Sequence, residues 1–206
     1  MIIIVDYGTG NLGSVKKAMD YIGCSSAVTK APGDIAGADG IILPGVGSFA
    51  DASENLRRTG MQGALRKAID SGKPFLGICL GMQLLMEWSE EGGFSRKGLG
   101  IFKGSVRRFS AKMGLKIPHV GWNSLDIIKK DVIFAGLPAK PYVYFVHSYH
   151  VAAESRDVVS ASSSYGTGFD AALASGKIYG TQFHPEKSGD TGLLILRNFA
   201  AVVYGS

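Results

Sequence analysis

The strongest constraint on the fold is the alternation of strand-like and helix-like segments over residues 1–87 of this 206-residue chain. The strand-like segments, rich in branched apolar residues, are 1–6, 25–30, 40–43 and 74–79. Between them apolar residues recur with helical spacing, as at Leu12, Val15 and Met19, and again at Leu56, Leu65 and Ile69. Strands that alternate with helices are typical of βαβ units, so this half predicts an α/β fold with a parallel sheet covered by helices on both faces.

The pattern changes after Gly98, where short strand-like segments follow one another with few helices between them. These segments are 104–109, 124–128, 142–151, 158–163, 169–174 and 177–183. They predict antiparallel pairing and extensions of the same sheet. A last helix is expected over 190–203, where Leu193, Leu196 and Phe199 share one face. No internal repeat and no linker composition divides the chain, so residues 1–206 are expected to form one domain.

Composition excludes several classes of protein. Hydrophobic residues make up 46% of the chain and charged residues 19%, which is too apolar for a disordered protein. The net charge is +5, but the basic residues come as scattered pairs such as Arg107-Arg108, without the stripe typical of nucleic-acid binding. No segment approaches the roughly 20 apolar residues of a membrane-spanning helix. With only Cys24 and Cys79 there is no disulfide framework, so we expect a cytoplasmic protein without a nucleic-acid or membrane partner.

The most specific local motif is Gly77-Ile78-Cys79-Leu80-Gly81, which directly follows an apolar strand. Its two glycines allow the sharp strand-to-helix turn called a nucleophile elbow. A helix expected to run through Met86 would place its positive dipole end at the Cys79 thiol and favour the nucleophilic thiolate. Cys79 is therefore the candidate nucleophile. The alternative is a buried, inert cysteine, and this is how we interpret Cys24, which lacks flanking glycines of this kind.

A thiol nucleophile needs a base, and the base needs an orienting group. The chain has four histidines, His119, His147, His150 and His184. Only His184 has a carboxylate at a useful spacing, in His184-Pro185-Glu186, where the proline keeps the backbone extended and residues 184 and 186 on one side. Because segment 177–183 ends like a sheet strand, His184 and Glu186 are expected to join Cys79 at the carboxyl edge of the sheet.

The remaining histidines, His119, His147 and His150, show no spacing that requires a metal ion. Two of them lie in the aromatic segment 142–151, which is interpreted as strand packing. Neither a metal site nor a cofactor is predicted.

Two glycine-rich loops follow other predicted strands. In Pro44-Gly45-Val46-Gly47 the glycines let a backbone N–H of Val46 point at a developing oxyanion, assisted by the N–H of Leu80, although a simple turn would explain the same residues. The loop over 8–13 has the spacing G-x-G-x-x-G of dinucleotide-binding proteins. The acidic residue that should end the second strand is absent from segment 25–30. A nucleotide-binding module without enzymatic activity nevertheless remains an alternative.

Taken together, these motifs resemble those of the class I, or triad, glutamine amidotransferases, and the resemblance extends over essentially the whole chain. Within that class they look like the glutaminase subunits of imidazole glycerol phosphate synthases. The segments that carry the likeness are 4–12, 44–49, 77–83, 119–123, 144–149 and 182–188. The resemblance implies a three-layer α/β fold with a mostly parallel central sheet, antiparallel extensions in the C-terminal half and no cofactor.

The resemblance also implies roles for single residues. Cys79 would attack the side-chain amide of L-glutamine, His184 would pass the proton to the leaving ammonia, and Glu186 would orient His184. The residues expected to bind glutamine are Gly47, Gln83, Glu91, Ser148 and Tyr149, with Glu90 as the alternative to Glu91. The oxyanion N–H groups would come from Val46 and Leu80. The residues expected to face a partner are Asn11, Trp122, Tyr144 and Lys187.

That partner, by resemblance, is a separate cyclase subunit with a (β/α)8 barrel, which would form a heterodimer with the chain. Ammonia would react there with a phosphoribulosyl-formimino aminoimidazole carboxamide ribonucleotide, giving imidazole glycerol phosphate and an aminoimidazole carboxamide ribonucleotide in histidine biosynthesis. The loop over 8–13 would then face the partner. A glutaminase subunit of anthranilate or aminodeoxychorismate synthase is the alternative with the same triad, but such relatives usually carry His where Met82 stands and Ser where Lys187 stands.

Overall fold

The computed structural model describes residues 1–92 and 96–205. Over these residues the strands are β1 (Ile2–Val5), β2 (Ser26–Thr29), β3 (Gly40–Gly45), β4 (Phe75–Cys79), β5 (Met86–Ser89), β6 (Arg96–Lys97), β7 (Phe102–Arg108), β8 (His119–Ser124), β9 (Asp126–Ile127), β10 (Tyr142–His147), β11 (Tyr149–Ala153), β12 (Val159–Ser164), β13 (Gly168–Ser175) and β14 (Ile178–Thr181). The α-helices are α1 (Leu12–Tyr21), α2 (Phe49–Arg58), α3 (Met61–Asp70), α4 (Leu80–Leu84) and α5 (Gly189–Tyr204). Short 3-10 helices are η1 (Pro32–Gly37), η2 (Ala111–Met113), η3 (Val132–Phe134), η4 (Arg156–Val158) and η5 (Pro185–Lys187).

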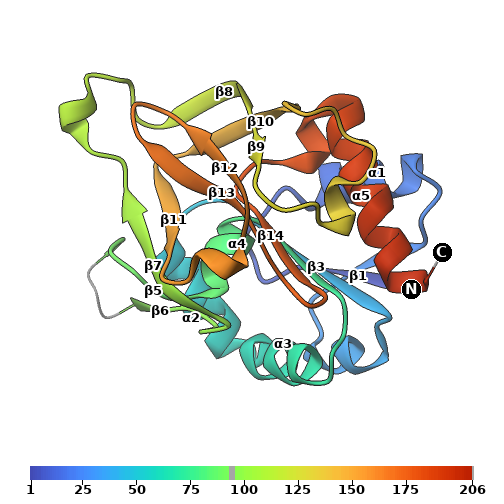
Figure 1. Ribbon diagram of the computed structural model, residues 1–206. Coiled ribbons are helices and arrows are strands. Elements are labelled where there is room, and N and C mark those ends of the chain that lie inside the picture. The colour runs from blue at the N-terminus through green and yellow to red at the C-terminus, as the bar shows by residue number, and fades with distance from the viewer. Residues whose placement is uncertain (93–95, 206) are drawn as a thin grey trace.

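One large sheet runs through the centre of the described chain in the order β2-β1-β3-β4-β14-β13-β11-β7-β5-β6 (Figure 1). Off this order, β12 pairs with β13, and β9 pairs with β12. Its parallel part is β2, β1, β3 and β4, as the strand-helix alternation predicts. The late strand β14 also joins β4 in parallel. The parallel part of the sheet therefore joins strands of the N-terminal half of the chain to β14, which lies close to the C-terminus.

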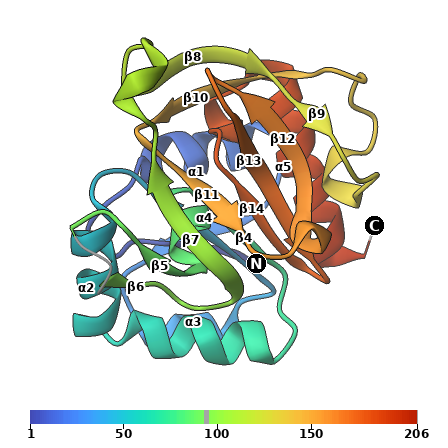
Figure 2. The same ribbon diagram turned by 60° about the vertical axis from the view of Figure 1, so that its left-hand side comes forward.

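Side chains of the central strands alternate between two hydrophobic cores. In β1, Ile3 and Val5 pack in the core that holds the buried faces of α2 and α3, whereas Ile2 and Ile4 pack in the core shared with α1 and α5. Figures 1 and 2 show α2 and α3 on one side of the sheet and α1 and α5 on the other. This arrangement confirms the predicted three layers.

Local signals explain where the helices begin and end. The Ser48 hydroxyl accepts a hydrogen bond from the Asp51 N–H at 3.5 Å and so caps α2, while Arg57 and Arg58 lie at its negative end. Gly205 ends α5 in a left-handed conformation, as helix C-termini often require. Within 1–92 and 96–205, no helix has both the length and the apolar character needed to cross a membrane.

The C-terminal half pairs mainly antiparallel, as predicted, but two of its predicted strands are wrong. The segment expected as one strand over 142–151 is two strands that separate at Ser148, because β10 pairs with β8 in a small second sheet while β11 pairs with β7 and β13. The strand expected over 124–128 lies mostly earlier, as β8, and only β9 falls within it. The β8–β10 ribbon thus stands apart from the main sheet (Figure 2).

The helix after Cys79 is also shorter than predicted. It ends at Leu84, and Met86 begins β5, where it pairs with Phe102 of β7. Pairing with a distant strand overrides the local helical preference here. The helix dipole at Cys79 is therefore that of little more than one turn.

Candidate active site

Cys79 lies in the sharp turn between β4 and α4. Its backbone has φ 55° and ψ −107°, and it is the one non-glycine residue with positive φ in the described part of the chain. A Cβ atom at Gly77 would lie 2.6 Å from the Gly81 carbonyl oxygen, and one at Gly81 would lie 1.8 Å from the Leu43 carbonyl oxygen. Only glycine fits at either position, so the predicted elbow geometry is confirmed.

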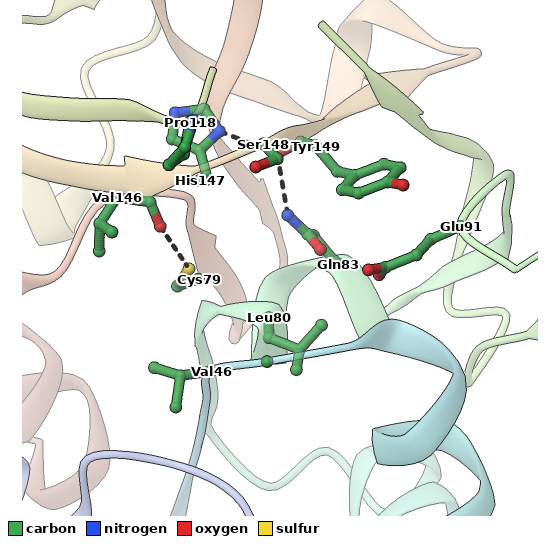
Figure 3. Close-up of a pocket in the computed structure, with 11 residues that line it drawn as sticks. Val46, Cys79, Leu80, Gln83, Glu91, Pro118, Val146, His147, Ser148 and Tyr149 are labelled. Atoms are coloured by element: carbon green, nitrogen blue, oxygen red, sulfur yellow. Dashed lines mark hydrogen bonds between the residues drawn. The ribbon is translucent and has the colours of Figure 1, made fainter. Parts of the chain in front are cut away.

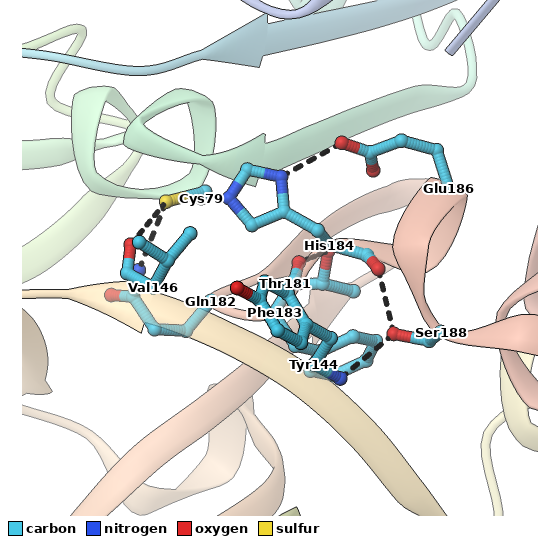
Figure 4. Close-up of polar contacts among 9 residues, drawn as sticks. All are labelled: Cys79, Tyr144, Val146, Thr181, Gln182, Phe183, His184, Glu186 and Ser188. Atoms are coloured by element: carbon cyan, nitrogen blue, oxygen red, sulfur yellow. Dashed lines mark hydrogen bonds and ion pairs between the residues drawn. The ribbon is translucent and has the colours of Figure 1, made fainter. Parts of the chain in front are cut away.

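His184 reaches the same edge of the sheet from the neighbouring strand. Thr181, the last residue of β14, pairs with Ile78 of β4, so both chains leave the sheet beside each other. The Nδ1 of His184 lies 2.8 Å from Oε1 of Glu186, and their side chains are 2% and 1% exposed. Figure 4 shows the imidazole between Cys79 and Glu186, with its other nitrogen on the Cys79 side. The structure therefore brings the predicted nucleophile, base and orienting carboxylate together.

A hydrogen-bond network fixes the backbone on both sides of His184. Its N–H donates to the carbonyl oxygen of Tyr144 at 3.0 Å, and its own carbonyl oxygen accepts from the Ser188 hydroxyl at 2.6 Å. The Ser188 hydroxyl oxygen in turn accepts from the Tyr144 N–H at 3.0 Å. His184 is thus held to strand β10 as well as to β14 (Figure 4).

The electrostatics of the histidines separate His184 from the others. Burial opposes a charge on His184, but Cys79 and Glu186 favour the imidazolium and raise its pKa to about 10. Burial lowers the pKa of His147 to about 3 and that of His119 to about 4, so both stay neutral. His184 is therefore the histidine suited to accept the proton of Cys79.

A pocket of about 280 Å³ opens in front of Cys79 (Figure 3). It is lined by Val46, Gly47, Cys79, Leu80, Gln83, Glu91, Pro118, Val146, His147, Ser148 and Tyr149. All the residues predicted to bind glutamine or its oxyanion are among them. Figure 3 shows Val46 and Leu80 on one side of the pocket and Ser148 and Tyr149 on the other, with Glu91 at the end away from Cys79. The pocket can therefore hold a small polar molecule with one end at the thiol.

The structure distinguishes the two adjacent glutamates. Oε2 of Glu91 accepts a hydrogen bond from the Phe49 N–H at 2.7 Å, and Glu91 lines the pocket. Oε1 of Glu90 instead accepts from the Arg108 N–H on β7. Glu91 is thus the glutamate that faces the pocket.

The four residues predicted to face a partner lie around η5. The rings of Trp122 and Tyr144, on paired strands β8 and β10, have centroids 6.1 Å apart, and Nζ of Lys187 lies 5.9 Å from the Tyr144 ring centroid. Asn11 immediately precedes α1, which packs against η5. Trp122 is 56% exposed, so this apolar surface faces outward.

Sequence reasoning missed several residues of the site. His147 and Pro118 line the pocket, and Gln182 donates from Nε2 to Sγ of Cys79 at 3.6 Å. Gln182 lies near the end of the segment predicted as a strand over 177–183 and directly follows β14, a position that could have indicated it. Among residues 1–92 and 96–205, no group of three His, Cys, Asp or Glu side chains could hold a metal ion.

Comparison with known proteins agrees with this geometry. Residues 3–203 match the family described as glutamine amidotransferase class-I, and the chain belongs to that family. Two solved structures share the fold at low identity. A crystal structure of a glutamine amidotransferase has a TM-score of 0.77 and 20% identity, with full coverage of both chains. The structure of PurLQS from Thermotoga maritima has a TM-score of 0.77 and 19% identity, covering 100% of this chain and 98% of the other.

Closer relatives narrow the family further. The imidazole glycerol phosphate synthase subunit HisH of Moorella thermoacetica is 46% identical over 202 residues, which are 98% of this chain and 95% of the relative. HisH of Caldanaerobacter subterraneus subsp. tengcongensis is 49% identical over 203 residues, 98% of each chain. Within the class I family, the chain therefore belongs to the HisH glutaminase subunits. This membership disfavours both the nucleotide-binding module and the anthranilate or aminodeoxychorismate alternatives.

A third relative is longer. The chloroplastic imidazole glycerol phosphate synthase hisHF of Arabidopsis thaliana is 46% identical over 201 residues, which are 97% of this chain but 34% of that protein. The chain thus corresponds to one portion of a longer polypeptide in that organism.

Proposed function

We propose that this chain is a single-domain, cytoplasmic glutaminase over residues 1–206, which supplies ammonia to a cyclase subunit in histidine biosynthesis. The observation that carries the proposal is the Cys79 thiol at one end of a pocket, with the hydrogen-bonded pair His184 and Glu186 behind it, in a chain of the HisH family. The reaction would convert glutamine and water to glutamate and ammonia.

The first half of the reaction forms a thioester. His184 Nε2 takes the thiol proton while Sγ of Cys79 attacks the side-chain carbonyl carbon of glutamine, and the carbonyl electrons move to oxygen. The N–H groups of Val46 and Leu80 stabilise this oxyanion. The intermediate then collapses: the C–N bond breaks, His184 gives its proton to the leaving nitrogen, and ammonia departs from a glutamyl thioester on Cys79.

The second half releases glutamate. A water molecule attacks the thioester carbon and gives a proton to His184. The C–S bond breaks, and the sulfur leaves as a thiolate that is reprotonated by His184. Throughout, Glu186 accepts the Nδ1 hydrogen bond at 2.8 Å, which keeps Nε2 directed at the reacting atoms.

Glutamine would lie along the pocket with its side-chain amide at Cys79. At the far end the Glu91 carboxylate suits the α-ammonium group, while Gly47, Ser148 and Tyr149 form the walls. The thiol at one end and the carboxylate at the other thus suit an amino acid whose side-chain amide reaches Cys79.

Ammonia would leave through the surface formed by Asn11, Trp122, Tyr144 and Lys187 into a (β/α)8-barrel cyclase. There it would react with the phosphoribulosyl-formimino ribonucleotide, giving imidazole glycerol phosphate and an aminoimidazole carboxamide ribonucleotide. The short distance along the chain from His184 to Lys187 supports this route, since η5 joins the triad to that surface. The Arabidopsis relative, whose name joins HisH and HisF in one polypeptide, supports a cyclase partner.

The test measures glutamate release from glutamine by the purified chain, alone and with a HisF-type cyclase plus its ribonucleotide ligand. We expect stimulation by the liganded cyclase and its complete loss in Cys79→Ala. Glutamate release that persists in Cys79→Ala, or none from the wild-type complex, would contradict the proposal.

A further inference from the structure

Gln182 is a fully buried amide in contact with the nucleophile, and the reaction described above gives it no role. Its side chain is inaccessible to solvent and contacts both Cys79 and Gln83, just after strand β14. Figure 4 shows it beside Cys79. Burying an amide costs free energy unless its polar atoms form hydrogen bonds. Both the oxygen and the nitrogen of the Gln182 amide have such partners.

Those partners determine which way the Gln182 amide faces. Nε2 of Gln83 donates to the carbonyl oxygen of Tyr149 at 3.0 Å and to Oε1 of Gln182 at 3.1 Å. Both hydrogens of that amide are thus used, and Oε1 of Gln182 is held toward Gln83. Nε2 of Gln182 is then directed at Sγ of Cys79, 3.6 Å away.

The sulfur has a second polar neighbour with the opposite preference. Sγ of Cys79 lies 3.9 Å from the carbonyl oxygen of Val146, which can only accept a hydrogen bond and so suits the S–H of the neutral thiol. After the proton has moved to His184, the sulfur has no hydrogen to donate, so it can no longer form a hydrogen bond with that carbonyl oxygen. The N–H of Gln182 can still donate, and a hydrogen bond to an ionised acceptor is roughly twice as strong as one to a neutral acceptor.

We propose that Gln182 anchors the Cys79 thiolate and that Gln83 keeps the Gln182 amide in its donating orientation. Gln83 also lines the glutamine pocket, so one chain of hydrogen bonds joins the pocket wall to the nucleophile. The anchoring role deepens the proposed glutaminase function and rests on it for its kinetic consequences. The state of the thiol itself is measurable without any turnover.

The first measurement is the rate of Cys79 alkylation by iodoacetamide against pH, in a Cys24→Ser background so that one thiol reacts. Gln182→Met keeps the side-chain length but removes the donor and the acceptor. Gln182→Glu keeps an acceptor for Gln83 and removes the donor to sulfur, but it also adds a negative charge beside the sulfur, so Gln182→Met is the variant that isolates the hydrogen bond. We expect the pH midpoint of alkylation to rise by about one unit or more in both variants, equivalent to a tenfold loss of thiolate at lower pH.

The second measurement separates anchoring from substrate binding. In the cyclase complex, Gln182→Glu is expected to lower kcat for glutamine by about tenfold with little change in KM, because its contact with Gln83 is kept. Gln83→Met is expected to raise KM as well, since Gln83 faces the pocket. Ser160→Ala, which removes a buried hydroxyl from β12 outside the site, is the control and should leave the alkylation midpoint unchanged.

The two proposals fail in different ways. An alkylation midpoint within about 0.3 units of wild type in Gln182→Met would overturn the anchoring role, even if glutamine is hydrolysed normally. A shifted midpoint in a protein that releases no glutamate in any complex would support the anchor and overturn the glutaminase. If Gln182→Met does not fold, Gln182→Leu, which also lacks the donor and adds no charge, is measured in its place.

Discussion

Two glycine-flanked turns follow neighbouring strands of the same sheet, yet their surroundings are opposite. The nucleophile turn over 77–81 follows β4 and is packed on all sides, with Cys79 only 6% exposed. The oxyanion loop over 44–47 follows β3, and its Val46 is 39% exposed. The first turn is fixed by contacts, whereas the second has room at Val46 and Gly47, although its Gly45, the last residue of β3, is packed against Tyr7 and Leu80.

Gly81 of the first turn and Gly47 of the second are therefore required for different reasons. At Gly81 any Cβ atom would collide with the Leu43 carbonyl group, whereas at Gly47 a Cβ atom would meet nothing within 4 Å. Gly47 is required only because its φ of 101° disfavours other residues. The comparison teaches that steric contact holds the nucleophile, while torsional freedom remains available to the loop expected to supply the oxyanion N–H.

The largest effect should come from Gly81→Ala. Because the new methyl group would lie 1.8 Å from a backbone oxygen, β3 and α4 must separate. We expect a loss of about 3 kcal/mol or more in the free energy of unfolding, measured by urea denaturation, together with loss of glutaminase activity. The matched control is Gly47→Ala, expected to cost about 1–2 kcal/mol from its backbone conformation alone. Equal losses in the two variants would break the comparison.

The next largest effect concerns the fixed side of the site. Glu186→Gln removes the carboxylate that orients His184 while leaving the fold intact, because the side chains have the same shape. We expect kcat for glutamine to fall by about 100-fold in the cyclase complex, with KM nearly unchanged. Retention of more than half of the activity would show that the network of Tyr144 and Ser188 orients His184 without Glu186.

A smaller effect, on the coupling between the two subunits, is expected at Lys187, which follows Glu186 and lies at the surface. Lys187→Ala removes the ammonium group above the Tyr144 ring, an interaction of about 0.5–1 kcal/mol at an exposed site. We expect the yield of cyclase product per glutamine hydrolysed to fall several-fold, measured by parallel assays of glutamate and imidazole glycerol phosphate. The triad is untouched, so unchanged coupling in the reconstituted pair would contradict the predicted role of this surface.

The mildest prediction concerns the buried histidines beneath the rim of the pocket. The Nδ1 of His119 donates to Nε2 of His147 at 3.0 Å, and the Nδ1 of His147 donates to the Tyr149 carbonyl oxygen at 2.8 Å, a tautomer assignment that follows from the partners. Burial lowers the pKa of His119 to about 4 and that of His147 to about 3, whereas unfolded histidine titrates near 6.5. Their stabilisation is therefore complete above about pH 6.5 and is lost as the pH falls toward 4.

The measurement is the free energy of unfolding from pH 7 to pH 4 in the wild type and in His119→Asn. Each histidine that gains a proton only on unfolding adds a slope of about 1.4 kcal/mol per pH unit. The variant should show a shallower decline below pH 6, since one such proton is removed. Identical slopes would mean that His119 titrates in the folded protein as it does in the unfolded chain.

The parallel half of the fold was predictable because its signals are local. Branched apolar runs mark the strands β1 to β4 within one or two residues, and Gly77 and Gly81 mark the turn that holds Cys79. The break at Ser148 was not predictable, since the aromatic and branched residues continue through it without glycine or proline. Only pairing of β10 and β11 with different distant strands separates them.

In the candidate site, too, local signals were predictable from the sequence and distant contacts were not. Pairing of His184 with Glu186 was predicted from a two-residue spacing and a proline, but the extended backbone expected over 184–186 is wrong beyond His184. Pro185–Lys187 form the 3-10 helix η5, and this turn brings Glu186 back to the imidazole. The choice between Glu90 and Glu91 depends on their contacts with Arg108 and Phe49, respectively. The direction of the Gln182 amide depends on its contact with Gln83. All three partners are far away in the sequence. Such contacts exist only once the strands of the sheet have paired.

The position of β14 beside β4 has a consequence for the newly made protein. Synthesis on the ribosome delivers Cys79 long before His184, and β14 can join β4 only when nearly the whole chain has emerged. Until then the cysteine has no base, because His184 follows β14 in the chain. An unfinished or truncated polypeptide therefore leaves cellular glutamine intact, and hydrolysis begins only with a completed subunit.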